Sequence, residues 1–273
     1  MEVKNLSAID FSILMNCFLK AFENYYVKMP TDHEYYKKRW QMANVRLELS
    51  YGMFDKDHLV GFIINAIDER NGNLIAFNTG TGVLPEYRGQ RIISTIYKHA
   101  ISELKTDGIT KCRLEVITEN TIAIKVYEFI GFKIIKSYKC YNGAVILKNE
   151  LTDFELKKVN ATYFDWATLS QDKYSWDNHI KTLKKGNYHY YTILVHNKPE
   201  SYFVIHPENG YVAQFNILNT TTDSWNRLFA AIRSISETIK INNVDEQLTS
   251  KITALNHIKL KNTVNQFEME LNL

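Results

Sequence analysis

The feature that most constrains the fold is a segment that occurs twice in diverged form. Residues 119–137 (ENTIAIKVYEFIGFKIIKS) align without a gap on residues 245–263 (DEQLTSKITALNHIKLKNT), so that apolar and lysine positions coincide. Two shorter pairs follow the same order, MFDKDHLVGFII with ILVHNKPESYFVI and NGNLIAFN with NGYVAQFN. Such an internal repeat predicts two related halves. A length of 273 residues is consistent with two domains, which we expect at 1–150 and 151–273.

Net charge favours the first half as the place for an anionic ligand. The chain carries +3 overall, and the excess of Lys and Arg over Asp and Glu lies in residues 1–150. This bias is weak, and no basic stripe with interleaved aromatic residues accompanies it, so we expect no nucleic acid partner. Hydrophobic residues make up 45% of the chain, which is enough to fill real cores and argues against disorder.

Cysteine usage favours a reducing compartment. Cys17, Cys112 and Cys140 form no CxxC pair and no Cys/His spacing typical of zinc, so neither a disulfide framework nor a metal site is expected. No basic and apolar leader opens the chain, and no run of about 18 apolar residues is present to cross a bilayer. We therefore expect a cytoplasmic protein with no membrane partner.

Hydrophobic periodicity in the first half changes between that of helices and that of strands. Helices are predicted over residues 10–26, from the capping-box pattern at 31–34 onward, and over 92–104 and 121–130. Strands are predicted within 47–83 and over 111–118, 132–138 and 141–147, and Asn71-Gly72 between two apolar runs predicts a hairpin. This order predicts a mixed α/β fold with a mostly antiparallel sheet flanked by helices.

The stretch LPEYRGQRIIS, which connects a strand to a helix, is the strongest candidate for binding chemistry. A turn that opens a helix presents unpaired N–H groups and the positive end of the helix dipole, which together suit a diphosphate. The candidate cofactor-binding residues are Val83, Leu84, Arg88, Gly89, Gln90, Arg91, Ile92, Ile93 and Ser94. We expect the amides of residues 89–94 to bind the ligand, with charge added by Arg88; an ordinary turn before an amphipathic helix is the alternative.

Residues 47–138 resemble the core of the GNAT superfamily of acyl-CoA-dependent N-acyltransferases. The residues that carry the resemblance are Val83, Pro85, Tyr87-Arg88-Gly89, Asn120-x-x-Ala123 and Tyr127-x-x-x-Gly131-Phe132. The resemblance implies acetyl-CoA as the cofactor, bound by the turn. Arg91 and Ile93 depart from the family pattern, which has small residues at both positions, and Ile93 would crowd the cofactor if it faced the phosphates.

The resemblance also implies roles for individual residues. Tyr127 would lie near the thioester sulfur and protonate the leaving thiolate, the alternative being a core tyrosine with a satisfied hydroxyl. Asn120 would reach the cofactor arm or simply cap helix 121–130. The oxyanion would fall to amides of the strand that ends at Val83, where Gly80 and Gly82 suit a bulge. The sequence does not single out a general base; Glu48, Asp68, Glu69 and Glu115 are the candidates.

The second half lacks the residues that carry the resemblance. Thr253, His257 and Ile258 stand where Tyr127, Gly131 and Phe132 stand in the first half, and its strand-to-helix connection (NILNTTTDSWNRL) has no Arg-Gly turn. We expect a catalytically silent, GNAT-like second domain that covers a face of the first, shapes the acceptor cleft or mediates a homodimer. Its histidines show no ligand pattern.

The leading hypothesis is an N-acetyltransferase that moves acetyl from acetyl-CoA to a primary amine by direct attack on the thioester. The acceptor, a small molecule or a peptide, cannot be identified from the sequence. The alternative is a catalytically weak module that binds acyl-CoA and acts as a sensor or scaffold.

Overall fold

Two units make up the chain in the computed structural model, which describes residues 1–148 and 151–273. Unit 1 contains Met1–Ile135 and Phe267–Leu273, and unit 2 contains Lys136–Gln266. The units divide between Ile135 and Lys136, whereas the sequence predicted the division after residue 150, so residues 136–148 lie in unit 2. The last residues, which the sequence assigned to the second domain, belong instead to unit 1, because the chain returns there to add a strand.

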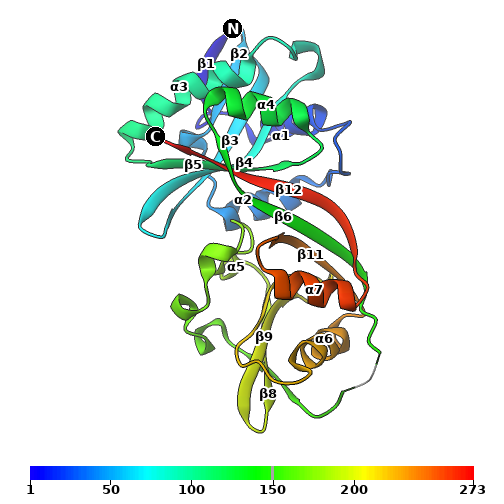
Figure 1. The fold of residues 1–273 in the computed structure, drawn as a ribbon. Coiled ribbons are helices and arrows are strands. Elements are labelled where there is room, and N and C mark those ends of the chain that lie inside the picture. The colour runs from blue at the N-terminus through cyan, green and yellow to red at the C-terminus, as the bar shows by residue number, and fades with distance from the viewer. Residues whose placement is uncertain (149–150) are drawn as a thin grey trace. The chain divides into compact units, whose positions relative to one another are not determined.

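Unit 1 is built on a sheet with the strand order β1-β2-β3-β4-β5-β12 (Figure 1). Its strands are β1 (Glu2–Asn5), β2 (Tyr51–Asp55), β3 (His58–Arg70), β4 (Asn73–Val83), β5 (Lys111–Ile117) and the end of β12 (Lys261–Asn272). The pairs from β1 to β4 are antiparallel, and β4 pairs with β5 in parallel. The predicted mixed α/β class, with a mostly antiparallel sheet, is confirmed.

Four helices cover the two faces of this sheet. They are α1 (Phe11–Ala21), α2 (His33–Ala43), α3 (Ile92–Thr106) and α4 (Thr121–Ile130). Residues of α1 and α2, including Phe18 and Trp40, pack with Phe62 of β3 on one face. Residues of α3 and α4 pack on the other face, where Ile96 and Tyr127 meet residues of β4 and β5. Each face thus buries the apolar side of two amphipathic helices.

Several element boundaries differ from the predicted ones, and Leu47–Leu49, expected within a strand, form a 3-10 turn. The first helix ends at Ala21, and the aromatic residues Phe22, Tyr25 and Tyr26 lie in the irregular segment after it. The second helix is capped by Asp32, whose side chain accepts a hydrogen bond from the amide of Glu34, and not by Thr31. The two strands predicted over 132–138 and 141–147 are one strand, β6 (Lys133–Ala144), because no turn residue separates them. Only tertiary packing decides such boundaries.

Unit 2 repeats the order of elements seen in unit 1. Its strands are β7 (Glu155–Val159), β8 (His189–Val195), β9 (Lys198–His206), β10 (Tyr211–Ile217), β11 (Thr238–Asp245) and most of β6 and β12. The helices are α5 (Ile180–Leu183), α6 (Ser224–Ile235) and α7 (Thr249–His257). In both units an antiparallel meander leads through a helix to a parallel strand and then a second helix. The internal repeat predicted from the sequence is therefore a repeat of structure.

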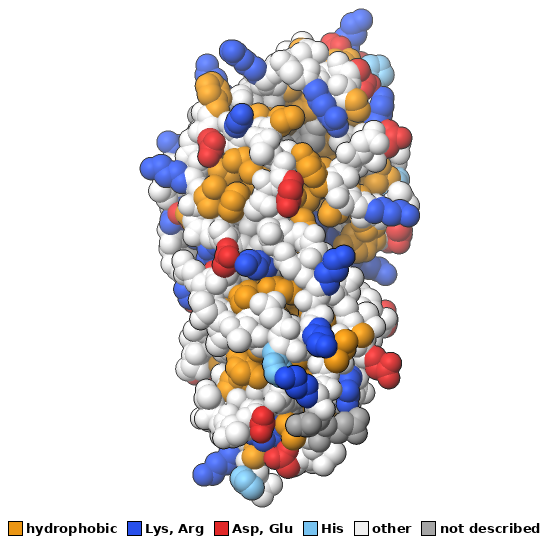
Figure 2. Space-filling view, turned by 45° about the vertical axis from the view of Figure 1, so that its right-hand side comes forward, with side chains coloured by type: hydrophobic (Ala, Val, Ile, Leu, Met, Phe, Trp, Pro, Cys, Tyr) orange, Lys and Arg blue, Asp and Glu red, His pale blue; other side chains and the backbone are white. Residues whose placement is uncertain are grey.

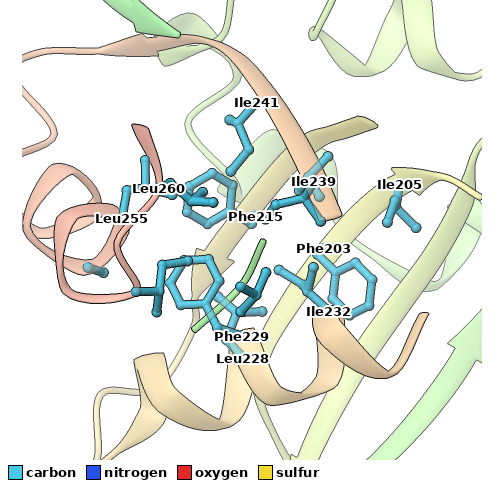
Figure 3. Packing of buried hydrophobic residues seen from close by; sticks show 14 of the residues in the cluster. Phe203, Ile205, Phe215, Leu228, Phe229, Ile232, Ile239, Ile241, Leu255 and Leu260 are labelled. Carbon is cyan, nitrogen blue, oxygen red and sulfur yellow. The ribbon is translucent and has the colours of Figure 1, made fainter. Parts of the chain in front are cut away.

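The core of unit 2 lies between α6, α7 and the sheet. Figure 3 shows Phe229 and Ile232 of α6 directed toward Phe203 and Phe215 of the sheet, with Leu255 of α7 beside them. These side chains are at most 2% exposed, so the unit buries a core of its own. Among the described residues, no helix is long and apolar enough to cross a membrane.

Candidate active site

The candidate site begins where β4 and β5 part. The two strands pair only from Ile75 to Asn78 on β4 and from Lys111 to Leu114 on β5, although β4 continues to Val83 and β5 to Ile117. Along a strand, successive backbone amides point alternately to the two neighbouring strands. After Asn78, the amides of β4 that point away from β3 therefore have no strand to pair with and face a gap. A gap of this kind can accept an extended ligand as an additional strand.

A β-bulge lies at the start of this gap. The register of β3 and β4 shifts so that Ile64 pairs with Gly80 and Asn65 with Asn78, which leaves Thr79 without a partner residue in the ladder. Bulges of this kind change the direction of the following side chains and are frequent next to active sites. The bulge expected for the strand that ends at Val83 is present, and it is centred on Thr79.

The turn after β4 exposes a group of unpaired amides. A 3-10 turn over Pro85–Tyr87 leads to Gly89, with φ of +77°, and to Arg91, with φ of +56°, before α3 begins at Ile92. In the described part of the chain, no group accepts a hydrogen bond from the amides of residues 89–94, and α3 has no side-chain cap. A helix start with free amides is an anion site, so the turn fits a diphosphate.

Arg91 and Ile93, the two departures from the family pattern, are both accommodated. Arg91 adopts the left-handed conformation that glycine adopts most readily, at a cost of about 1 kcal/mol. Its backbone therefore follows the path of a glycine. Ile93 is half-buried and packs against the hydrophobic cluster between α3 and the sheet. Its side chain thus contributes to the core of unit 1.

Two of the residues expected to bind the cofactor, Arg88 and Leu84, use their polar groups in hydrogen bonds within the protein. The Arg88 guanidinium donates to the carbonyl of Ala21 from Nη2, at 3.0 Å, and to that of Val83 from Nε, at 3.3 Å. It thus joins the C-terminus of α1 to the end of β4, a position that suits a cation. The amide of Leu84 donates to the carbonyl of Val60 at 2.9 Å. Both residues shape the turn.

Tyr127 projects from α4 toward the end of β4. Its ring is 7% exposed and contacts Tyr97 and Phe132 edge-on. Burial raises the pKa of Tyr127 to about 12. At neutral pH the hydroxyl therefore carries its proton. A neutral phenol in this position can donate a proton and cannot serve as a base.

Asn120 acts as the N-cap of α4. Its Oδ1 accepts a hydrogen bond from the amide of Ala123 at 3.2 Å, so one of the two alternatives for this residue is realised. Tyr25 lies near Asn120, and burial is the main cause of the raised pKa of Tyr25. Tyr25 in turn lies close enough to Tyr127 to raise the pKa of that phenol.

Sequence reasoning missed four polar residues at the site. Asn78 and Thr81 of β4, Tyr97 of α3 and Tyr25 after α1 all lie within the network around Tyr127. Of these four, only Asn78 could have been noticed in the sequence, because a polar side chain at an inward position of an apolar strand is unusual. The candidate bases Glu48 and Asp68 form ion pairs with Arg46 and Arg70, at 2.5 and 3.1 Å.

The corresponding region of unit 2 is filled by its own side chains. The ladder between β10 and β11 is limited to Tyr211 and Lys240. Tyr174 donates to the carbonyl of Phe215 at 3.2 Å, and Lys251 of α7 donates to the Tyr174 hydroxyl at 3.0 Å. A small pocket there is lined by these side chains and by Asp245.

The start of α6 also differs from that of α3. Arg227 of α6 and Glu200 of β9 form a buried ion pair at 2.7 Å, and Arg227 also donates to the carbonyl of Thr222 in the preceding connection. The connection before α6 is therefore held by side chains of unit 2 itself. Like α3, α6 begins without a side-chain cap, but unit 2 has Thr253 where unit 1 has Tyr127.

Comparisons with known proteins agree with this geometry. Residues 13–132 match the model of the Acetyltransferase (GNAT) family. N-alpha-acetyltransferase 30 of Schizosaccharomyces pombe (strain 972) is 26% identical over 101 residues, which is 37% of this chain and 63% of that protein. The chain thus matches less than two thirds of the length of that relative.

Solved structures resemble both units together. A tandem GNAT protein from the clavulanic acid biosynthesis pathway has a TM-score of 0.69 and 10% identity, over 99% of this chain and 98% of its own. A GCN5-related N-acetyltransferase from Sphaerobacter thermophilus has a TM-score of 0.67 and 6% identity, over 99% and 95%. At such identities the likeness shows the fold alone. The match to the GNAT family thus covers residues 13–132, which lie in unit 1, and the fold of the chain resembles that of a tandem GNAT protein.

Proposed function

We propose that unit 1 transfers an acetyl group from acetyl-CoA to a primary amine by direct attack on the thioester. The observation that carries the proposal is the gap between β4 and β5. Tyr127 packs against Tyr97, whose hydroxyl accepts from Asn78 where the pairing ends, and the free amides of residues 89–94 follow the end of β4. A thioester that enters with its diphosphate on these amides would extend along β4 toward Tyr127.

Each part of the site has a separate task in this proposal. The amides of residues 89–94 hold the diphosphate, since they have no other acceptor. Amides of β4 beyond Asn78 pair with the extended arm of the donor and stabilise the oxyanion that forms during attack. Tyr127, with a pKa of about 12, holds a proton for the thiolate that leaves. Acetyl-CoA supplies the activated acyl group.

The acceptor belongs to the proposal as well. The curated relative is an N-alpha-acetyltransferase, a name that makes the amino terminus of a peptide the first acceptor to test. The approach to Tyr127 on the side of α1 is aromatic, because Phe22 packs edge-on against Tyr25 and Tyr25 against Tyr26. Such a surface suits an acceptor with an apolar side chain.

Release of CoA thiol from acetyl-CoA tests the function, measured with the full chain over a panel of peptides and small amines. We expect release that depends on one class of acceptor and a mass gain of one acetyl group on that acceptor. Tyr127→Phe should lower kcat by about a hundredfold to ten-thousandfold, a range set by loss of a general acid, and should leave the Kd for acetyl-CoA unchanged.

Isothermal titration with acetyl-CoA separates the enzyme from the alternative function. Binding without turnover over the whole panel would favour the sensor or scaffold, whose support is the charged Arg91 in place of a small residue. No binding at high micromolar acetyl-CoA would contradict both. An unchanged kcat in Tyr127→Phe would contradict the role of Tyr127 alone.

A further inference from the structure

We propose that α4 of unit 1 is a contact surface for a second copy of this chain, and that two copies form a symmetric dimer with their α4 helices packed antiparallel. The surface is an apolar stripe on the outer side of the helix, formed by Ile122, Val126 and Phe129 and named here the α4 stripe. The proposal goes beyond the proposed function, because the stripe points away from Tyr127. The sequence predicted a homodimer through the second domain, whereas the α4 stripe lies in unit 1.

Helical periodicity brings the side chains of the α4 stripe together. Positions 122, 126 and 129 are four and three residues apart, so they follow one another along one side of the helix. Tyr127, on the other side, packs into the core between α3, α4 and the sheet. Ile122 and Phe129 are 75% and 77% exposed, more than any other large hydrophobic side chain in the described part of the chain. Figure 1 shows α4 on the outside of unit 1, in front of the sheet.

The second copy of the fold provides a comparison for this helix. α7 follows β11 as α4 follows β5, and the second and ninth residues of each helix are exposed. In α4 these residues are Ile122 and Phe129, whereas in α7 they are Ser250 and His257. The fold therefore does not require apolar side chains at these positions. Apolar side chains that gather on one exposed face mark an interaction site, unlike those that occur singly.

Charged residues beside the α4 stripe identify a second copy as the occupant. Lys125 and Glu128 are both exposed and lie on the same side of the stripe, about one turn apart. In the part of the chain that the structure describes, neither side chain forms an ion pair. A partner that covers the stripe must therefore present a negative and a positive group in the reverse order. The α4 helix of another copy, turned by a two-fold axis, presents this arrangement.

Two-fold symmetry also fits the apolar side chains together. In an antiparallel pair whose axis passes midway between positions 125 and 128, Lys125 of each copy lies at the height of the partner's Glu128. Because each residue advances the helix by about 1.5 Å, Phe129 of each copy then lies between the heights of the partner's Ile122 and the partner's Val126. A side chain of one helix thus enters a groove of the other, as in ordinary helix packing.

Sedimentation velocity of the full chain tests the proposal. One pair of helices buries less than the about 1,200–2,000 Å² of a stable interface, so we expect a monomer at about 1 µM and a dimer at a few hundred micromolar, roughly the range of weak complexes. Phe129→Glu should raise the Kd of the dimer by at least about tenfold, because it places a charge within the apolar contact. Since Phe129 is 77% exposed, the variant should fold with an unchanged Tm.

Charge reversals test the antiparallel arrangement itself. Lys125→Glu and Glu128→Lys should each raise the Kd by about fivefold to a hundredfold, because the two-fold axis turns two attractive contacts into two repulsive ones. A mixture of these two variants should associate more tightly than either variant alone, since each copy then meets opposite charges. The double variant Lys125→Glu/Glu128→Lys should return the Kd to within about threefold of the wild type.

Ile13→Glu provides the matched control, because Ile13 of α1 is also an exposed apolar residue of unit 1, at 51%. It should leave the Kd of the dimer within about threefold of the wild type, as expected of a surface change outside the contact. A chain that stays monomeric at a few hundred micromolar would overturn the proposal and leave another protein as the occupant of the stripe. A dimer that Phe129→Glu leaves intact, or a mixture that shows no restoration, would overturn it as well. Failure of acetyl transfer would not affect these measurements, because they require no acetyl-CoA.

Discussion

At the scale of single residues, the structure identifies an unusual lysine in unit 2. Lys251 is 5% exposed, donates to the hydroxyl of Tyr174 and has its Nζ 4.8 Å and 5.0 Å from the ring centroids of Tyr174 and Phe215. In the described part of the chain, no carboxylate lies within salt-bridge distance of Nζ. Burial lowers the pKa of Lys251 to about 7.

The stability of unit 2 should consequently rise with pH. An unfolded lysine with a pKa near 10.5 holds its proton between pH 7 and 10.5, whereas the folded amine has lost it, so each pH unit within this window adds up to about 1.4 kcal/mol to the free energy of unfolding. Below about pH 7 the lysine is protonated in both the folded and the unfolded protein, so the full cost of burying the charged amine remains. Urea unfolding followed by tryptophan fluorescence measures this, because Trp166, Trp176 and Trp225 lie in unit 2.

The variant Lys251→Met provides the control. It keeps an unbranched side chain between the two rings and removes the titrating amine, so the dependence on pH between 7.5 and 9.5 should flatten and the stability at pH 7 should increase. A slope as steep as that of the wild type would show that another group is responsible.

At the scale of elements, the turn before α3 depends on one glycine. Gly89 has φ of +77°, and a Cβ added to it would have open space within 4 Å, so replacement costs backbone energy and causes no clash. Gly89→Ala should lower the free energy of unfolding by about 1 to 2 kcal/mol and raise the Kd for acetyl-CoA, because the relaxed turn would move its amides.

Two other glycines serve as matched controls for this prediction. Gly72 and Gly108 have φ of +73° and +79°, and both also have open space around an added Cβ. Alanine at either position should lower the stability by a similar amount and leave the Kd for acetyl-CoA unchanged by calorimetry. Equal Kd values for all three variants would show that the turn at Gly89 does not bind the donor.

Some elements of the candidate site could be predicted from the sequence, and others could not. Free amides were expected from the strand, turn and helix order around Gly89, because helix starts expose N–H groups whatever the fold. The engagement of Arg88 with the carbonyl of Ala21 was not predictable, since the partner lies far away in sequence. The same is true of Thr81, whose direction depends on one extra residue in β4.

At the scale of the whole molecule, the end of the chain stabilises the unit in which the chain begins. Residues 267–273 belong to unit 1, where Met269 is fully buried and the amide of Leu273 donates to the carbonyl of Thr110. Glu270 pairs with Lys111 and Arg113 of β5, at 2.8 and 2.7 Å. Unit 1 is therefore incomplete without residues that follow unit 2 in the chain.

Met269→Ala should accordingly weaken unit 1. Loss of a buried methionine side chain costs about 2 to 5 kcal/mol, and amide hydrogen exchange in β1–β5 should become faster. The exposed Asn272 of the same strand provides the control, because Asn272→Ala should change stability by less than about 0.5 kcal/mol. Faster exchange confined to residues 151–266 would contradict the assignment of the last strand to unit 1.

Surface charge is also a property of the whole molecule. On the face shown in Figure 2, basic and acidic side chains are interspersed with apolar ones and do not gather by sign. The most exposed large apolar side chains of unit 1 include Ile122 and Phe129 of α4, at 75% and 77%.

The sequence by itself determined the order of elements, the internal repeat, the turn before α3 and the loss of that turn in the second half. These features follow from local periodicity, capping and turn chemistry, which act over a few residues. Only the tertiary structure decided that β12 returns to unit 1 and that Asn78, Thr81 and Tyr97 meet beside Tyr127. The physical reason is that strand pairing and side-chain direction depend on a bulge and on contacts between distant residues, to which local propensity does not respond.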